Sequence, residues 1–458
     1  MWRKLSKSVL PLVLCVALLM VVFAVAACGE EETTETTAAT TATTAGGTET
    51  TAGGTETTAG GTDTTAAPTE TTLGGKDTLV FGAARPVSGP LASFEEANFG
   101  PAYKCWAEDV NAAGGIMVAE YGKKMPIELK IYDDQSDMDT SMRLISKLME
   151  EDKVDFLLPN CSTAFNFAAA GVANAGGYIY QSGESGATTL EAELAKGSLP
   201  LFFQILNYSN HFQMPVFAEI MQEKGAKTCA VVYLDDLHGI EYQAQAQIFF
   251  ETAGIDIVSN TAVPMDIKDM SSIVQQIQKD NPDIVCSFCY PPQSILLVQT
   301  LIQLNVNPKA LLIGPGGASQ WFYTMFNGAL EGVFFEGAWS VNSSPEAAAY
   351  YERLKEFLGD DQNIDFWGAL QYRGQLEFFQ QAIEKAGTLD QEKVAEVMRT
   401  EHFPTVVGDT YFDATQSWPQ AVYPGQIGQW QNAIAEVVDP GEHRTAEPIY
   451  PKPAWPAQ

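Results

Sequence analysis

From residue 78 onward, short apolar runs alternate with longer segments that have the apolar spacing of amphipathic helices. Such alternation is typical of parallel sheets covered by helices, because a crossover must return the chain to the same end of the sheet before the next parallel strand. The first series of the pattern predicts strands at 78–82, 127–132, 155–158 and 178–181, and helices at 98–111, 140–151 and 164–175.

A second series follows an apolar crossing segment at 201–206. It predicts helices at 215–224, 241–253, 271–280 and 293–304, and strands at 228–234, 255–260, 284–290 and 310–314. Residues 333–335 lead the chain back, two helices at 345–358 and 367–386 cover the first series, and the tail from 406 is strand-like and rich in turns.

The two series predict an α/β protein with two doubly wound parallel-sheet lobes that face each other across a cleft. The first lobe is expected to comprise 77–204 plus 337–405, and the second 205–336 plus 406–458. Ligands of parallel sheets bind beyond the carboxyl ends of the strands, so residues at those ends are the candidates for a binding site.

Residues 1–27 have the features of an export signal. Basic residues at positions 3, 4 and 7 precede an apolar run from Val9 to Ala27, and small residues come directly before Cys28. The run 25–28 resembles the lipobox of bacterial lipoproteins, which implies that Cys28 carries a lipid. The alternatives are a plain signal peptide with an incidental cysteine, or a transmembrane anchor.

The segment 28–76 consists almost wholly of Thr, Ala, Gly and Glu, and the seven residues 48–54 recur at 55–61. Such a composition buries too little surface to offset the entropy of ordering the chain. We therefore expect a flexible tether with a root-mean-square span of about 40 Å.

Composition excludes several classes of function. A net charge of −31 argues against nucleic acid as a partner, because phosphate binding needs clustered Lys and Arg. Among the seven cysteines, Cys286 and Cys289 have a C-x-x-C spacing, but they lie in a predicted buried strand with no second pair nearby. We interpret them as buried thiols rather than a redox or zinc site. The four histidines are dispersed, so no metal or cofactor is expected.

Six short motifs occur in a characteristic order along the region from residue 78 to the C-terminus. They are Pro86–Pro90, Asp109–Ile116, Tyr132–Asp137, Cys161–Thr163, Asp235–Gly239 and Ile313–Gly317. In these motifs the chain resembles the extracytoplasmic solute-binding proteins of ABC transporters, and most closely the leucine/isoleucine/valine-binding group with the type I periplasmic-binding fold. The resemblance implies lobes joined by a multi-strand hinge that close over a small solute and present it to a permease in the membrane.

The resemblance also implies candidate site residues. In the family, loops that match 161–163 and 182–188 hold the carboxylate of the ligand with hydroxyls and backbone N–H groups, and two aromatic residues lie in the cleft. The matching residues here are Ser162, Thr163, Ser182, Ser185, Phe94 and Tyr290. Thr163 could equally be a helix N-cap, Phe94 a core residue, and Tyr290 a half-buried ring.

Four positions depart from the family pattern. Gly316 stands where amino-acid binders have the acid that holds the α-ammonium, and His238 stands where a tyrosine is common. Glu184 and Arg85 replace small residues. Glu184 could supply the missing acid, and Arg85 could pair with Glu184 or with a carboxylate of the solute. Alternatively, both are surface charges at the edge of the cleft.

We expect a lipid-anchored monomer outside the cell membrane that binds an amino acid, an amide or a small carboxylate. Phe94, Tyr290 and Trp321 leave room for a planar portion. One alternative is a sensor for a separate signalling partner. Another is a serine esterase, because residues 183–187 nearly match a nucleophile elbow around Ser185, with Asp413 and His443 as formal partners.

Overall fold

The computed structural model describes residues 75–183, 185, 187–205, 212–337, 339–423 and 425–456. These residues belong to one compact unit of the chain, 68–458. The expected export signal, Cys28 and nearly all of the expected tether lie outside the described residues, and so does Glu184.

The first lobe is built on parallel strands, as the sequence predicts. Strand β1 (Leu79–Arg85) lies between β4 (Ile127–Asp133) and β5 (Phe156–Leu157), and β6 (Tyr180–Ser182) pairs with β7 (Phe202–Gln204). Nearly every residue of β1 is buried, which is the pattern of a parallel strand covered on both faces. The helices of this lobe are α2 (Phe99–Ala112), α3 (Met138–Glu150), α4 (Thr163–Ala175) and α5 (Thr188–Ala195). The sequence analysis missed α5, because only two of its residues are buried.

The second lobe contains one larger sheet, in the order β16-β15-β12-β11-β10-β8-β9. The strands are β8 (Thr228–Leu234), β9 (Asp256–Val263), β10 (Ile284–Phe288), β11 (Ala310–Ile313), β12 (Phe334–Glu336), β15 (Ile427–Gln431) and β16 (Ile434–Val437). Only β15 and β16 run antiparallel to their neighbours in this sheet. Its helices are α6 (Met214–Glu223), α7 (Leu237–Ala253), α8 (Ser271–Asp280), α9 (Pro291–Gln303) and α10 (Gln320–Met325). The parallel sheets with covering helices confirm the predicted α/β class.

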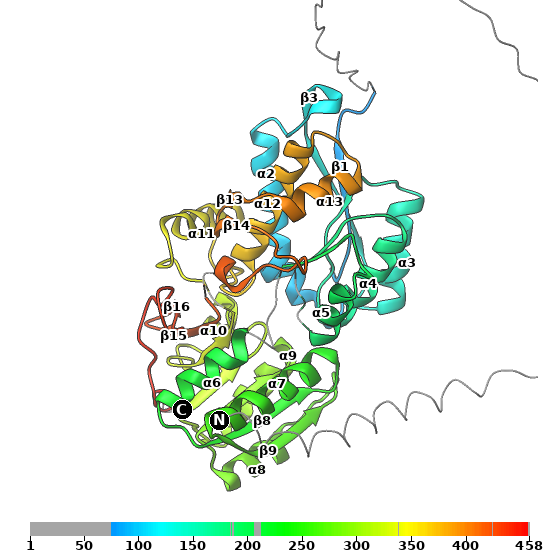
Figure 1. Ribbon diagram of the computed structural model, residues 1–458. Coiled ribbons are helices and arrows are strands. Elements are labelled where there is room, and N and C mark those ends of the chain that lie inside the picture. Colours follow the sequence, from blue (N-terminus) through cyan, green and yellow to red (C-terminus); the bar gives the residue numbers. More distant parts are fainter. Residues whose placement is uncertain are drawn as a thin grey trace, which may run out of the picture. The chain divides into compact units, whose positions relative to one another are not determined.

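The chain returns from the second sheet to complete the first lobe (Figure 1). Helices α11 (Pro345–Leu358) and α12 (Ala369–Ala386) pack on α2, as predicted, and α13 (Gln391–Thr400) packs on α12. Several short pieces were not predicted, among them α10, α13, the hairpin of β2 (Ile116–Val118) with β3 (Lys123–Met125), and the hairpin of β13 (Phe403–Thr405) with β14 (Gly408–Thr410). The hairpin strands have three residues each, too few to show a clear apolar period. Helix α13 buries Val394, Ala395 and Met398 on one face, a pattern that the sequence analysis overlooked.

The segments that cross between the two sheets are hydrogen-bonded to one another. Trp418 donates its backbone N–H to the carbonyl of Gln204 at 3.0 Å, and Gly337 donates to that of Gln426 at 2.7 Å. The Tyr423 hydroxyl donates to the carbonyl of Ile205. The described parts of the crossings therefore form one bonded unit between the lobes.

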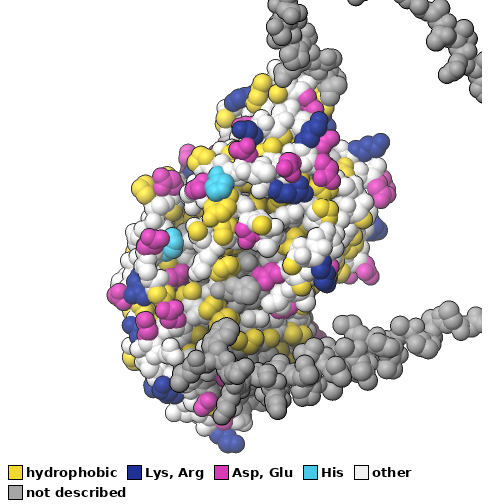
Figure 2. All heavy atoms as spheres, in the orientation of Figure 1, with side chains coloured by type: hydrophobic (Ala, Val, Ile, Leu, Met, Phe, Trp, Pro, Cys, Tyr) yellow, Lys and Arg dark blue, Asp and Glu magenta, His cyan; other side chains and the backbone are white. Residues whose placement is uncertain are grey.

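Cys286 and Cys289 are buried and neither forms a disulfide with a described residue, which confirms their interpretation as buried thiols. None of the described helices is both long and apolar enough to cross a membrane. Acidic and basic side chains are interspersed over the face shown in Figure 2. That face shows none of the clustered basic charge that nucleic acid requires.

Helix α7 begins in very close contact with the end of β8. A Cβ atom on Gly239 would lie 2.0 Å from the carbonyl oxygen of Leu234, so only glycine fits there. Gly171, in α4, is also helical, but it is exposed and a Cβ atom there would meet nothing within 4 Å. Gly171 is therefore a matched control for the close contact at Gly239.

We expect Gly239→Ala to lower the free energy of unfolding by about 2–3 kcal/mol, because the backbone must move to admit the methyl group. Gly171→Ala should instead raise it by about 0.5–1 kcal/mol through helix propensity. Urea unfolding of both variants measures the difference. Equal effects of the two substitutions would contradict the close contact between α7 and β8.

Candidate functional site

A small cavity lies where the two lobes meet. It is lined by Phe94, Ser162, Thr163, His238, Tyr290, Pro315 and Trp367. Ser162 and Thr163 follow β5 of the first sheet, whereas His238, Tyr290 and Pro315 follow β8, β10 and β11 of the second. Residues beyond the carboxyl ends of strands in both sheets thus share one cavity. Its volume is about 10 Å³, which is room for about one water molecule.

The backbone of Ser162 is strained. Its φ of 62° and ψ of 155° lie in a region that is almost exclusive to glycine and costs of order 1–3 kcal/mol for other residues. The side-chain amide of Asn166 holds this turn by donating to the carbonyls of Ser162, at 2.9 Å, and Asn160, at 3.1 Å. The Tyr180 hydroxyl in turn donates to Asn166 at 2.9 Å. Strain that is held by a buried network is a frequent feature of functional sites.

The N-cap alternative for Thr163 is wrong. Ser162 occupies the N-cap position of α4, Thr163 is the first helical residue, and the Ser162 side chain makes no capping hydrogen bond. Both residues remain in the cavity wall, at the N-terminus of a 13-residue helix. The orphan N–H groups and the dipole of a helix N-terminus favour an anion.

Aromatic rings from both lobes meet in this cavity. The rings of Phe94 and Tyr290 pack edge-to-face with centroids 5.6 Å apart, and Trp367 lies 6.4 Å from Phe94. His238 stacks on Tyr290 at 5.1 Å with an interplanar angle of 22°. These distances are favourable for aromatic pairs, and they give the cavity apolar, planar walls.

Two polar atoms at the cavity are buried, Nε2 of His238 and the hydroxyl of Tyr290, in residues that are 5% and 2% exposed. Nε2 of His238 has no hydrogen-bond partner among the described residues, whereas the Tyr290 hydroxyl interacts with the side chains of Asp236 and Ser162. Burial, with the nearby charge of Asp236, raises the pKa of Tyr290 well above its usual value, so its hydroxyl remains a donor. An unpaired buried group costs about 1–3 kcal/mol, so Nε2 of His238 is a candidate to bind a ligand, with the Tyr290 hydroxyl beside it.

Arg85 lies at the end of β1, fully buried, and does not line the cavity. Its Nε donates to Glu95 at 3.0 Å and its guanidinium also donates to the carbonyl of Pro159 at 3.0 Å. Burial opposes ionisation of Glu95, but the charges of Arg85 and Lys104 and hydrogen bonds from Lys104 and Tyr103 outweigh it and lower the pKa of Glu95. The alternative that Arg85 is a surface charge is therefore wrong.

Ser182, at the end of β6, and Ser185, in the loop before α5, are both buried, and their hydroxyls are hydrogen-bonded to each other. Neither lines the small cavity. At Gly316, φ is 93° and a Cβ atom would lie 2.5 Å from Pro291, so the acid of the family cannot be accommodated there without movement. Of the predicted residues, Phe94, Ser162, Thr163, His238 and Tyr290 are brought together.

The sequence analysis missed Trp367 and Pro315 and included Trp321, which lies in α10 and does not line the cavity. The predicted helix began at residue 367, but α12 begins at Ala369. The carboxylate of Asp365 accepts from the N–H groups of Trp367 at 3.1 Å and Gly368 at 2.7 Å. An aspartate two residues before the tryptophan was the signal that Trp367 precedes the helix.

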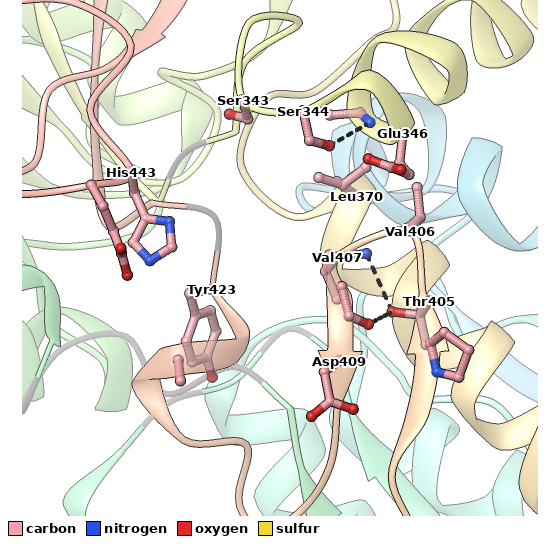
Figure 3. Close-up of a pocket in the computed structure, with 15 residues that line it drawn as sticks. Ser343, Ser344, Glu346, Leu370, Thr405, Val406, Val407, Asp409, Tyr423 and His443 are labelled. Carbon is pink, nitrogen blue, oxygen red and sulfur yellow. Dashed lines mark hydrogen bonds between the residues drawn. The ribbon is translucent and has the colours of Figure 1, made fainter.

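A larger cavity of about 580 Å³ lies near the N-terminus of α11, the β13–β14 hairpin and the chain around Tyr423 and His443 (Figure 3). No residue predicted for solute binding lines it. His443 does, but Ser185 and Asp413 do not, and the Asp413 carboxylate instead accepts from Thr415 at 2.7 Å. The three residues that an esterase would need are therefore not brought together at this cavity.

Comparison with known proteins gives the family. A model described as periplasmic binding protein matches residues 78–433. The leucine-, isoleucine-, valine-, threonine- and alanine-binding protein of Pseudomonas aeruginosa is 25% identical over 338 residues, which are 73% of this chain and 86% of that protein. Such relatives are binding proteins, not enzymes.

Solved structures share the fold. A leucine-binding protein of Thermotoga maritima has a TM-score of 0.65 and 17% identity, with 78% of this chain and 97% of that chain covered. A solute-binding protein of an ABC transporter from R. palustris, in complex with benzoate, has a TM-score of 0.67 and 16% identity, with 83% and 98% covered. The chain therefore belongs to the periplasmic binding protein family, with the type I fold of its leucine-binding group.

Proposed function

We propose that this protein binds a small carboxylate with a planar or branched apolar portion, by closing its lobes around it, and delivers it to an ABC importer. The observation that carries the proposal is the shared cavity. Residues from the ends of both sheets line it, the buried Nε2 of His238 has no partner among the described residues, and it adjoins the N-terminus of α4. In this arrangement Ser162, Thr163 and the α4 N-terminus hold the carboxylate, and the aromatic rings hold the apolar portion.

The lining favours a carboxylate without an ammonium group. None of the seven lining residues is acidic, the nearby Asp236 is engaged with Tyr290, and the position of the acid of the family is Gly316. A buried ammonium group without a carboxylate partner would be strongly disfavoured. The benzoate complex of the R. palustris relative supports the aromatic class. An amino acid is the second candidate, because the Pseudomonas aeruginosa relative is named for amino acids.

Entry of a solute requires the cleft to open. A cavity of about 10 Å³ holds no more than a water molecule, and aromatic contacts from both lobes enclose it. A ligand shifts the equilibrium between open and closed lobes only by the difference between its affinities for the two states. A solute that contacts Ser162 of one lobe and Tyr290 of the other at the same time binds the closed state more tightly, which provides that difference.

Membership of the family implies an extracytoplasmic location. We further infer that Cys28 carries a lipid and that 28–76 tethers the binding unit to the outer face of the cell membrane, where it acts as a monomer. Within that unit we assign 77–204 with 337–405 to the first lobe, and 205–336 with 406–458 to the second. The support is the sequence pattern around Cys28 and the composition of the tether.

A thermal-shift screen of the protein, refolded to remove carried-over solute, tests the ligand class. We expect benzoate or 4-hydroxybenzoate to raise the unfolding temperature by several degrees, because ligand at 100 times its Kd adds about 2.7 kcal/mol. Leucine should have a smaller effect. A larger shift with leucine than with any aromatic carboxylate would contradict the proposed class.

Two substitutions test whether the shift in unfolding temperature arises from binding in the cavity. Tyr290→Phe should weaken binding roughly tenfold, because the solute loses a hydrogen bond, whereas Tyr178→Phe, outside the cavity, should not. Ser162→Gly should stabilise the solute-free protein by about 1 kcal/mol while it weakens binding, since it removes both the strain and a hydroxyl. Unchanged affinity in both cavity variants would place the solute elsewhere.

Protonation of His238 makes the free energy of unfolding depend on pH. Burial lowers its pKa to about 4, although Asp236 acts in the opposite direction, and the rings of Tyr242 and Tyr290 pack on it. The unfolded chain has a histidine pKa of about 6.5. Between these values the unfolded state binds more protons, so stability is full above pH 6.5 and is lost as pH falls toward 4.

We therefore expect acidification from pH 7 to pH 4 to lower the unfolding free energy of the wild type by up to about 3 kcal/mol more than that of His238→Gln. Urea unfolding at several pH values measures this difference, and other titrating groups cancel in the comparison. Parallel pH profiles for the two proteins would show that His238 is accessible to protons in the folded state.

Metabolic labelling with palmitate tests the anchor. We expect the label to be incorporated into the wild type and into Cys15→Ser, and to be absent from Cys28→Ser, because only the cysteine after the small residues is a lipid acceptor. The readout is the label on the immunoprecipitated protein. Equal labelling of Cys28→Ser and wild type would contradict lipidation at this position.

A further inference from the structure

A carboxylate of the second lobe is hydrogen-bonded to the first lobe. Glu241 lies in α7 and is only 7% exposed. Its Oε2 accepts from the Thr188 hydroxyl at 2.6 Å, and its Oε1 accepts from the Thr189 hydroxyl at 3.3 Å. Helix α7 follows β8 of the second sheet, whereas Thr188 and Thr189 begin α5, which follows β6 in the first lobe (Figure 1).

Helix α5 lacks a cap of its own. Its N-cap residue is Ala187, which has no side chain that could accept from the first-turn N–H groups. A helix of eight residues gains little stability from its own hydrogen bonds, so an uncapped N-terminus is costly to it. The carboxylate of Glu241 lies at this terminus, where the helix dipole favours a negative charge.

Both partners of this contact lie close in the sequence to residues of the candidate site. Glu241 comes three residues after His238 in the same helix, so both lie on one helical face. On the other side, Thr188 directly follows the loop that joins β6 to α5 and contains Ser185. Helices α4 and α7 also contact each other, and α4 carries Ser162 and Thr163 at its start.

We propose that Glu241 and Thr188 form a latch that sets solute affinity without touching the solute. This inference rests on the proposed function, since it assumes that the lobes open to admit a solute. Because the two residues belong to different lobes, opening separates them, and their hydrogen bond contributes only to the closed state. A closed-state contact slows release of the solute and leaves its capture nearly unchanged.

A double-mutant cycle tests the latch. We expect two substitutions each to raise the release rate of bound 4-hydroxybenzoate roughly tenfold, with an association rate within about twofold: Glu241→Gln, which removes the charge from this hydrogen bond, and Thr188→Val, which removes its donor. The double variant should release it no faster than the worse single variant, because both substitutions act on the same interaction. Thr188→Ser keeps the hydroxyl and should restore slow release.

Glu251→Gln is the matched control, because Glu251 is an exposed residue of the same helix. It should leave the release rate unchanged. A merely structural role for Glu241 would lower the unfolding temperature of the solute-free and solute-bound protein equally. That result, or a release rate of Glu241→Gln equal to that of Glu251→Gln, would overturn the latch.

Hydrogen exchange separates this inference from the ligand class. In the protein as purified, the amides at the start of α5 should exchange faster in Glu241→Gln than in Glu251→Gln, with no change in α8. If no carboxylate shifts the wild type, the proposed function fails, and this exchange alone decides whether the latch forms. Equal exchange in the two variants would then refute it.

Discussion

The hydrogen bonds among the crossing segments are the constraint on which the rest of the site depends. They join the end of β7, the exit of β12 and the approach to β15, at Gln204, Gly337 and Gln426 among others. With the crossings bonded in this way, residues beyond the carboxyl ends of strands in both sheets share one small cavity. Each lobe contributes only part of the lining, so neither lobe could form the site by itself.

Energetic cost is concentrated around this cavity. The backbone of Ser162 is strained, and Nε2 of His238 is buried without a partner among the described residues. At the exit of β12, the carboxyl group of Glu336 is fully buried, and burial raises its pKa well above the usual value although a hydrogen bond with Tyr242 opposes this. A protein selected for stability alone would not retain such features. Their position agrees with a site that is completed by a ligand.

Much of the fold could be predicted, because most helices and strands have a clear apolar period. Most of the elements that were missed, α5 and the three-residue hairpin strands among them, are short, and their sequences show no clear apolar period. The candidate site was predicted in part. Five lining residues were named from motifs at strand ends, but Trp367 was assigned to a helix and the salt bridge of Arg85 with Glu95 was not foreseen. Those two outcomes depend on contacts between segments far apart in the sequence.

The sequence by itself determined the class of the protein. Its alternating pattern requires parallel sheets, and its motifs at the strand ends identify loops that line the candidate site. Only the tertiary structure decided which of those loops meet, because parallel strands from separate sheets place their ends together only after the crossings are bonded. It also decided that Glu241 faces Thr188, since a contact between helices of different lobes leaves no period and no motif in the sequence.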